Sequence, residues 1–268
     1  MKETDQKFNM SFDIRAKYYN IYRKADMRLT REIIKLTGAK SDSLILDVGA
    51  GTGNYSISLI NMGYNVIALE PEKGMIEQCF DKRVNWICSS VYKIPLANNS
   101  VDTAIIVNAI HHFKDLEMAF LELKRVVGKG TIIIFTFDPD IACKQWIFEY
   151  WPSLVKYEHS NYLPINKLKY QILNAVGGNL EEYIYKLPSD FEDVFSAALW
   201  KRPSLLLESS EIKYAMSIFN SLDDTSFNCG LSKLRQDIIS RNWEKKNQEL
   251  LYVDEWDVGC RLLKLEIF

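Results

Sequence analysis

The chain has few cysteines, and their arrangement signals no fixed site. Five cysteines are scattered through 268 residues without a C-x-x-C pair, so neither a zinc site nor a disulfide framework is indicated. Because isolated cysteines are usually core residues, we expect reduced, mostly buried thiols and no metal ion. The five are Cys79, Cys88, Cys143, Cys229 and Cys260.

The chain also lacks an excess of either charge and any long apolar run. Lys and Arg number 33 against 35 Asp and Glu, and no long basic run could follow a phosphate backbone, so nucleic acid is a poor candidate substrate. No apolar stretch approaches the roughly 20 residues that span a bilayer. The polar start MKETDQK lacks the apolar core of a signal peptide. We therefore expect a cytoplasmic globular protein without a membrane partner.

A glycine that dinucleotide-binding turns require is also absent from the chain. Residues 44–53 read LILDVGAGTG, an apolar, β-prone run that passes through Asp47 into three alternate glycines. A dinucleotide-binding G-x-G-x-x-G turn needs glycine at position 54, which is Asn54. We expect a helix to begin near Gly53, and the turn after Asp47 suits a ligand with an ammonium group better than a pyrophosphate. The glycines are Gly49, Gly51 and Gly53.

Strands and helices alternate along the first half of the chain. A helix is predicted over residues 12–38, with Gly38 at its C-terminal end, and another where apolar residues repeat at helical spacing from Leu116 to Val127. Such alternation predicts an α/β protein with a parallel sheet, helices on both faces and ligands at the carboxyl ends of the strands. Further strands are predicted at Asn65–Glu70, Val84–Cys88, Val101–Val107 and Thr131–Phe137.

The sequence pattern changes after Asp138-Pro139: the following region is predicted to be mainly helical and is rich in aromatic residues. We expect one domain over residues 1–268. Its core would cover about 38–139 plus strands near 180–187 and 258–268, and its cap about 140–178 and 189–250 together with the N-terminal helix 12–37. The aromatics of the cap would suit an apolar, planar or cationic ligand, although core packing explains them equally well.

At these motifs the chain resembles the class I S-adenosylmethionine-dependent methyltransferases, in particular the type 11 small-molecule group that includes ubiquinone and menaquinone biosynthesis enzymes. The resemblance covers residues 44–137 and rests on D-V-G-A-G-T-G, Glu70, the Ile94-Pro95-Leu96 segment and the run from Asn108 to His112. It implies a Rossmann-like, mainly parallel seven-stranded sheet with a mostly helical cap. The implied cofactor is S-adenosyl-L-methionine, with S-adenosyl-L-homocysteine as product.

The resemblance also implies a set of cofactor-binding residues. Glu70 would accept hydrogen bonds from the ribose hydroxyls, and Asp47 would face the methionine ammonium. Ser90 and the backbone N–H of Val91 would hold the adenine, although related sequences carry an acid and an alanine after the small residue. Met75 would pack on the adenosine, or be a plain core residue. The remaining members of the expected set are Tyr19, Arg23, Gly49, Ala50, Gly51, Gly53, Pro71, Asn108 and Ala109.

Two adjacent histidines follow the fourth strand, where the transferable methyl group should lie. His112, or else His111, could act as a general base because imidazole titrates near neutrality. Either could instead cap a helix or line the pocket. Arsenic-methylating relatives use cysteines as substrate ligands, so Cys143 and Cys229 keep that alternative open.

The expected reaction is methyl transfer to an N, O, S or C nucleophile of a small molecule or short peptide. Two alternatives remain at this point: a nicotinamide-dependent oxidoreductase built on the same sheet, and a non-catalytic cofactor-binding or partner-binding protein that retains the fold. Asn54 in place of glycine counts against the first. The sequence leaves the methyl acceptor and the oligomeric state open.

Overall fold

The computed structural model describes residues 18–268, except the side chain of Ser210, and divides into two compact units. The sheet unit comprises Ala25–Asp138, Leu163–Tyr185 and Cys260–Phe268. The helical unit comprises residues 18–24, Pro139–Tyr162 and Lys186–Gly259.

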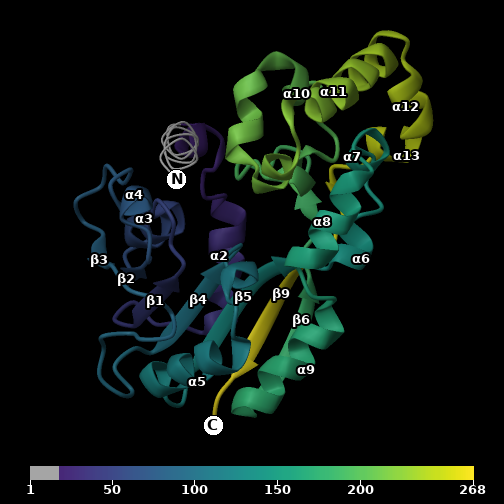
Figure 1. The fold of residues 1–268 in the computed structure, drawn as a ribbon. Coiled ribbons are helices and arrows are strands. Elements are labelled where there is room, and N and C mark those ends of the chain that lie inside the picture. The colour runs from purple at the N-terminus through teal and green to yellow at the C-terminus, as the bar shows by residue number, and fades with distance from the viewer. Residues whose placement is uncertain (1–17) are drawn as a thin grey trace, which may run out of the picture. The chain divides into compact units, whose positions relative to one another are not determined.

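The sheet unit contains a seven-stranded sheet with strand order β3-β2-β1-β4-β5-β9-β6 (Figure 1). The five strands from β3 to β5 run parallel, and β9 is antiparallel to both β5 and β6. This confirms the predicted mainly parallel, Rossmann-like sheet. The strands are β1 (Leu44–Val48), β2 (Asn65–Leu69), β3 (Asn85–Ile87), β4 (Thr103–Val107), β5 (Thr131–Phe137), β6 (Asn179–Ile184) and β9 (Cys260–Glu266).

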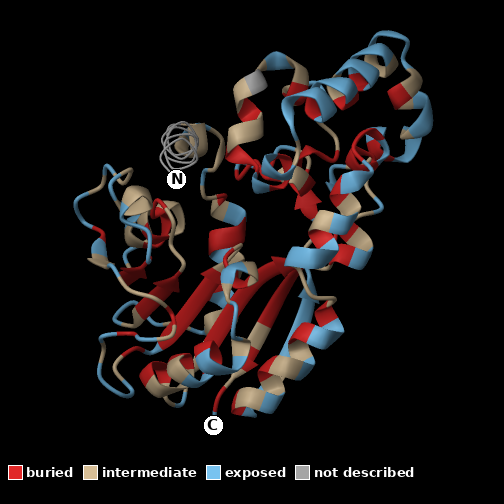
Figure 2. Cartoon of the chain, viewed as in Figure 1, coloured by how far each residue is buried: buried red, intermediate tan, exposed pale blue. Residues whose placement is uncertain are grey.

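The central strands are buried on both faces, as their unbroken apolar runs require. In β1, Leu46 lies between Ile67 of β2 and Ala104 of β4 in the strand register. Leu46 and Ala104 are fully buried. Figure 2 shows the same burial along β4, β5 and β9. The sheet therefore forms a rigid base whose carboxyl edge carries the candidate site.

Helices cover the sheet in two layers. One layer contains α2 (Met27–Thr37), which contacts α3 (Asn54–Asn61), β5 and β9. The other contains α5 (Leu116–Val127) and α9 (Ile165–Val176), which contact each other in front of the sheet in Figure 1. Two short elements complete the unit, α4 (Lys73–Ile76) and the 3-10 helix η1 (Ile110–His112).

The helix predicted over residues 12–38 is interrupted. Residues 18–22 are helical, residues 24–26 are not, and α2 begins at Met27. Asp26 is the reason for the new start, because its side chain accepts a hydrogen bond from the Arg28 N–H as an N-cap. Gly38 ends α2 with φ of 66°, as predicted. Residues 12–17 lie outside the described part of the chain.

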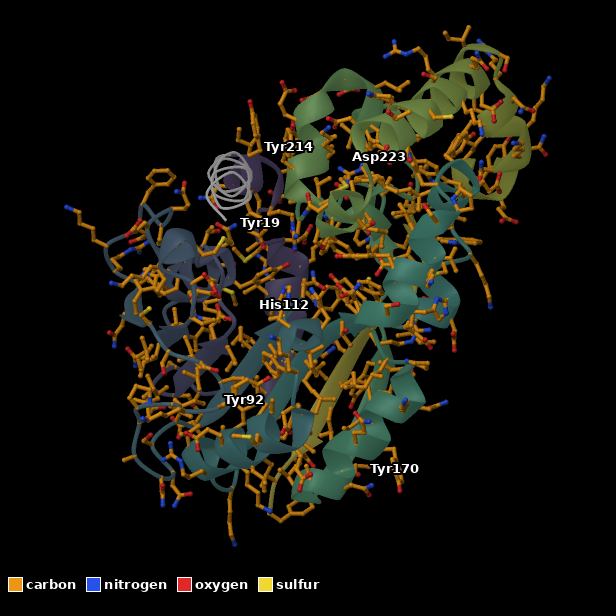
Figure 3. All side chains as sticks on the ribbon, viewed as in Figure 1. Tyr19, Tyr92, His112, Tyr170, Tyr214 and Asp223 are labelled. Atoms are coloured by element: carbon orange, nitrogen blue, oxygen red, sulfur yellow. The ribbon has the colours of Figure 1, made fainter. Side chains whose placement is uncertain are left out.

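The two units divide the chain at other residues than the expected cap bounds. The expected cap extended to residue 178, but α9 belongs to the sheet unit, where the Lys124 ammonium of α5 donates to the Val176 carbonyl at 2.8 Å. Tyr170, which falls within the expected cap, is an exposed residue of α9 (Figure 3). The helix from Met27 also belongs to the sheet unit rather than to the cap. The expectation of one domain over residues 1–268 stays a prediction.

Aromatic residues build the core of the helical unit. Trp151 packs against Phe219 and Phe227 with ring centroids 5.2 and 5.8 Å apart, and its indole N–H donates to the Phe227 carbonyl. A Cβ on Gly230 would lie 2.2 Å from the same indole nitrogen, so only glycine fits there. Core packing therefore accounts for Trp151, one of the aromatics that could have served a ligand.

Apart from α11, which has 16 residues, the helical unit consists mostly of short elements. Its helices are α6 (Pro139–Ala142), α7 (Ile147–Tyr150), α8 (Ser153–Asn161), α10 (Leu205–Glu208), α11 (Asp224–Ile239), α12 (Asn242–Lys246) and α13 (Gln248–Leu251). It also contains η2 (Ser196–Leu199), η3 (Ser210–Ala215), η4 (Ser217–Ser221) and the strand pair β7 (Leu187–Pro188) and β8 (Glu255–Trp256). Within residues 18–268, no helix combines the length and the apolarity needed to cross a bilayer.

Glu158 of α8 is a buried acid in the helical unit. The residue is 2% exposed, and its Oε2 has no hydrogen-bond partner among the described residues. Burial raises the pKa of this carboxyl to about 7, well above its ordinary value of 4.5. Ionisation is therefore more costly in the folded protein than in the unfolded chain.

We predict that Glu158→Gln stabilises the protein above pH 7. Because the folded-state pKa is raised, the free energy of unfolding falls as pH rises from about 4.5 to about 7, and the neutral amide removes this loss. Urea unfolding at pH 8 should show the variant about 1–3 kcal/mol more stable than the unmodified protein, with no advantage at pH 4.5. The exposed Glu208→Gln is the matched control. Equal stabilities at both pH values would contradict this account of Glu158.

Candidate functional site

The turn after β1 holds three glycines in left-handed backbone conformations. Their φ angles are 71° at Gly49, 58° at Gly51 and 83° at Gly53, a region that other residues rarely adopt. The N–H groups of Gly49 and Ala50 both donate to the Leu69 carbonyl, at 2.8 and 3.1 Å. The turn is thereby tied to the end of β2, and α3 begins directly after it at Asn54.

Gly49 also lets two loops approach each other. A Cβ built on Gly49 would lie 2.6 Å from the Cβ of Ala109, which follows β4. Real Cβ atoms do not approach so closely, so any larger residue would push the two loops apart. Gly49 and Ala109 were both predicted site residues, and the structure brings them into contact at the carboxyl edge.

Asp47 is a buried acid of β1. It is 2% exposed, and the Ser56 hydroxyl donates to its Oδ2 at 2.6 Å. Burial, together with the negative charge of Glu70, raises the pKa of the Asp47 carboxyl to about 6, although the hydrogen bond from Ser56 acts in the opposite direction. No cationic side chain of the described residues lowers this pKa. A ligand ammonium would provide the missing positive charge.

Glu70 follows β2 and is 7% exposed. Its Oε2 accepts a hydrogen bond from the Gly51 N–H at 2.9 Å, and its Oε1 accepts one from the Glu72 N–H at 3.0 Å. Burial raises its pKa above the ordinary value. Sequence reasoning predicted Glu70 as a ligand-binding acid but missed its bond to the glycine turn, because the two residues are 19 positions apart.

The segment after β3 offers a backbone donor. The Ser90 hydroxyl accepts a hydrogen bond from the Tyr92 N–H at 3.3 Å, so this side chain is partly used within the loop. Among the described residues, no backbone carbonyl accepts a hydrogen bond from the Val91 N–H. Met75 of α4 is half-buried and Pro71 is exposed.

Asn108 presents a buried amide at the end of β4. Its backbone has φ of 50°, and its N–H donates to the Phe135 carbonyl at 2.9 Å. Both polar side-chain atoms, Oδ1 and Nδ2, are buried without a hydrogen-bond partner among the described residues. A buried amide left in this way costs free energy, which a polar ligand would recover.

His111 and His112 lie in η1, with ring centroids 3.9 Å apart. The His112 residue remains exposed, yet desolvation by the surrounding protein lowers the pKa of its imidazole below its ordinary value. The lowered pKa favours the neutral imidazole, which is the form able to accept a proton.

Tyr19 and Arg23, the other predicted residues, lie in the helical unit, whereas the rest of the predicted set lies in the sheet unit. The Arg23 guanidinium forms an ion pair with buried Asp193 and lies 5.0 Å above the Tyr19 ring. The Val194 N–H donates to the Tyr22 carbonyl in the same segment. Arg23 thus holds residues 18–24 to the helical unit, and a cofactor contact for Tyr19 or Arg23 stays a prediction.

The cysteines form no disulfide, and all five lie in the described part of the chain. The expectation of mostly buried thiols is wrong, because only Cys260 of the five is buried, whereas Cys88 and Cys229 are exposed. Burial raises the pKa of the Cys143 thiol to about 12, so it stays protonated at neutral pH. A protonated thiol is a poor metal ligand. No group of three or more His, Cys, Asp or Glu side chains within residues 18–268 is placed to hold a metal ion.

These groups fit a cofactor with an ammonium, a diol and a heterocycle. The buried acids Asp47 and Glu70 lie beside the glycine turn. Polar groups that have no partner among residues 18–268 follow β3 and β4 at Val91 and Asn108. All of them are at the carboxyl edge of the parallel strands, where such sheets bind ligands.

A family model described as a methyltransferase domain matches residues 46–135. The chain is 33% identical to a solved structure described as a methyltransferase from an antibiotic biosynthesis pathway of Anabaena variabilis, with a TM-score of 0.86, and the match covers 92% of this chain and 99% of that one. It is 25% identical to the malonyl-[acyl-carrier protein] O-methyltransferase of Yersinia pestis over 59% of this chain, and it spans only 60% of that enzyme.

A more distant solved structure shares the fold alone. The phosphoethanolamine N-methyltransferase 2 of Haemonchus contortus, in complex with phosphomonomethylethanolamine and S-adenosylhomocysteine, has a TM-score of 0.59 at 15% identity. The match covers 95% of this chain and 56% of that one.

We predict that Gly49→Ala destabilises the protein more than Gly38→Ala does. Both positions have similar positive φ angles, 71° and 66°, but a Cβ on Gly38 meets nothing within 4 Å. The contact with Ala109 should therefore add about 1–3 kcal/mol to the cost of backbone strain alone. Urea unfolding of the two variants measures the difference, and equal losses would show that the Gly49 loop yields without cost.

Proposed function

Because the chain belongs to the S-adenosylmethionine-dependent methyltransferases, we propose that it transfers a methyl group from S-adenosylmethionine to an N, O, S or C nucleophile of a small molecule. One observation supports the proposal above all others: two buried acids, Asp47 and Glu70, flank a turn in which three alternate residues are glycines without Cβ atoms. The turn admits a ligand close to the backbone, and the acids match its ammonium and hydroxyl groups.

In the proposed complex, Asp47 binds the methionine ammonium and Glu70 accepts hydrogen bonds from the ribose hydroxyls. Ser90 and Val91 hold the adenine, and Met75 and Pro71 pack beside the adenosine. The Asn108 amide and the backbone of Ala109 lie at the reactive end. The turn residues Gly49, Ala50, Gly51 and Gly53 contribute their backbone.

The bound cofactor supplies a methyl group on a positively charged sulfur, which is a good leaving group. The residues of the chain then have to hold the donor and the acceptor in line and exclude water, which is worth roughly 7–11 kcal/mol in favourable cases. His112 can accept a proton when the acceptor must lose one, because its lowered pKa favours the neutral form. His111 remains the second candidate for this role.

A small-molecule acceptor and a cytoplasmic location belong to this proposal. They rest on the sequence, which lacks a long basic run and an apolar span. The acceptor named for the Yersinia pestis relative is a property of that enzyme, and this chain spans 60% of it. The proposed acceptor is therefore defined only by its reacting atom, an N, O, S or C nucleophile of a small molecule.

The direct test is S-adenosylhomocysteine formation from S-adenosylmethionine over a panel of small amines, phenols, thiols and carboxylates, followed by mass spectrometry. We expect at least one acceptor to gain 14 mass units in step with product formation. Gly51→Val is the control, because a β-branched side chain strains a backbone with φ of 58° and would add atoms where the ligand is proposed to approach the turn. Equal turnover by this variant would remove the glycine turn from the proposed site.

We predict that Glu70→Ala weakens S-adenosylhomocysteine binding about 10-fold to 100-fold. The substitution removes an acceptor of two buried hydroxyl bonds, worth about 1–3 kcal/mol, and also the bond that braces the Gly51 N–H. Calorimetric titration gives the affinity, and thermal melting reports the fold. The exposed neighbour Glu72→Ala is the control. Unchanged affinity in a folded Glu70→Ala protein would refute the ribose assignment.

We predict that S-adenosylhomocysteine binds more tightly as pH rises through about 6. The pKa of Asp47 is about 6 without ligand, and an ammonium binds only the ionised carboxylate, so protonation below this pH competes with binding. Affinity should rise about tenfold from pH 5 to pH 7, with a proton released per ligand bound below pH 6. Asp47→Asn should flatten the profile. The same slope in that variant would assign the pH dependence to another group.

A further inference from the structure

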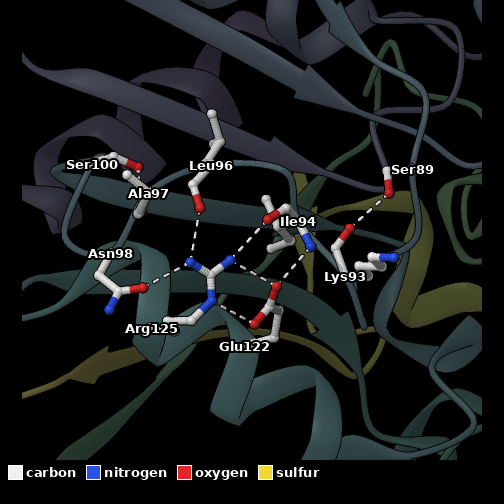
Figure 4. A network of polar contacts seen from close by, with 9 residues as sticks. All are labelled: Ser89, Lys93, Ile94, Leu96, Ala97, Asn98, Ser100, Glu122 and Arg125. Atoms are coloured by element: carbon white, nitrogen blue, oxygen red, sulfur yellow. Dashed lines mark hydrogen bonds and ion pairs between the residues drawn. The ribbon is translucent and has the colours of Figure 1, made fainter.

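An ion pair on α5 is bound to the loop that leads into β4 (Figure 4). Glu122 and Arg125 are three residues apart on this helix and form two parallel bonds, from Nε to Oε2 at 2.7 Å and from Nη2 to Oε1 at 2.8 Å. The pair is half-buried, with the Arg125 side chain 33% and the Glu122 side chain 17% exposed. Two-point contact fixes the orientation of both side chains.

The same pair holds the loop backbone from both sides. The Ile94 N–H donates to Glu122 Oε1 at 2.7 Å, and Arg125 Nη2 donates to the Ile94 carbonyl at 2.8 Å. Arg125 Nη1 donates to the Leu96 carbonyl at 2.8 Å and to Asn98 Oδ1 at 2.9 Å. One ion pair therefore determines where Ile94 lies, through hydrogen bonds that involve charged groups and are stronger than neutral ones.

The Ser90-Val91 segment lies only a few residues before Ile94, and hydrogen bonds connect the two. Ser89 Oγ donates to the Lys93 carbonyl at 2.7 Å, and the Lys93 N–H donates to the Ser90 carbonyl at 3.1 Å. This closed turn ends directly before Ile94. Val91 and Ile94 also belong to the same buried core, at 7% and 2% exposure. A shift of Ile94 would therefore move the Val91 N–H.

We propose that Glu122 and Arg125 are positioning residues for the adenine of the cofactor. They do not touch the ligand; they hold the loop so that the Val91 N–H, which lacks a backbone acceptor among the described residues, is aimed at an acceptor atom of the base. The inference rests on the proposed function, because it assumes that S-adenosylmethionine binds.

The arrangement makes the pair more important to the loop than to overall stability. Ion pairs near the protein surface contribute little to folding on their own, about 0–1 kcal/mol. The bond to Arg125 holds the pKa of Glu122 below its usual range, so both charges persist near neutral pH. Their loss should therefore be detected first as an altered preference for the base.

The test compares two ligands that differ only in the base. Adenine accepts a hydrogen bond at N1, whereas hypoxanthine carries a hydrogen there, so S-inosylhomocysteine cannot accept from the same N–H. Calorimetry should show that the unmodified protein prefers S-adenosylhomocysteine by at least about tenfold, since sites built for a hydrogen bond reject analogues that lack it. Arg125→Met should lose about tenfold in affinity for S-adenosylhomocysteine and little for the inosine analogue.

Three further variants complete the design. Arg125→Lys should retain part of the preference, because an ammonium can still donate to a loop carbonyl, and Glu122→Gln should retain part through its amide oxygen. Arg83→Met, which breaks an exposed network at Asp81 and Asn61, should leave the preference unchanged. If Arg125→Met fails to fold, Arg125→Lys and Glu122→Gln decide the question.

Two results would overturn the inference. They are an equal loss of affinity for both ligands, which indicates a purely structural pair, and an unchanged preference in all Arg125 and Glu122 variants. An unmodified protein that binds neither ligand would instead refute the proposed function.

Discussion

The hydrogen bond from the Gly51 N–H to the Glu70 carboxylate is the interaction on which the candidate site depends. It links the turn after β1 to the end of β2, and the Leu69 carbonyl reinforces the link by accepting from Gly49 and Ala50. Glycine adopts the left-handed backbone of this turn without steric cost, and these hydrogen bonds select that conformation from the many that glycine can reach. The same carboxylate is the proposed partner of the ribose, so Glu70 both holds the glycine turn and binds the ligand in the proposed complex.

The two buried acids explain why the site should take a cationic ligand. Burial and repulsion by Glu70 raise the pKa of Asp47 to about 6, and burial raises the pKa of Glu70 above its ordinary value. No cationic side chain of the described residues offsets this repulsion at Asp47. A ligand ammonium would do so, whereas a pyrophosphate would add negative charge to it. The electrostatics of the site therefore separate the methyl donor from a dinucleotide.

The sequence predicted the features that local chemistry determines. Apolar runs predicted the strands from β1 to β5, and a glycine predicted the end of α2 at Gly38. Both signals depend only on residues that are close together in the chain. It could not predict contacts between distant segments: the pairing of Arg23 with Asp193, the packing of α9 on α5, and the hold of Arg125 on the loop at Ile94. The first and third contacts join residues 170 and 31 positions apart, and the second depends on which helix packs on which face of the sheet. The spacing of apolar residues along the chain does not specify such long-range contacts.

Titration calorimetry with S-adenosylhomocysteine and, separately, with NADH tests the central claim most directly. The account predicts saturable binding of one S-adenosylhomocysteine per chain and no detectable binding of NADH, because Asn54 ends the phosphate-binding pattern and the buried acids oppose an anion. Binding of NADH without binding of S-adenosylhomocysteine would contradict it and return the chain to the oxidoreductase alternative.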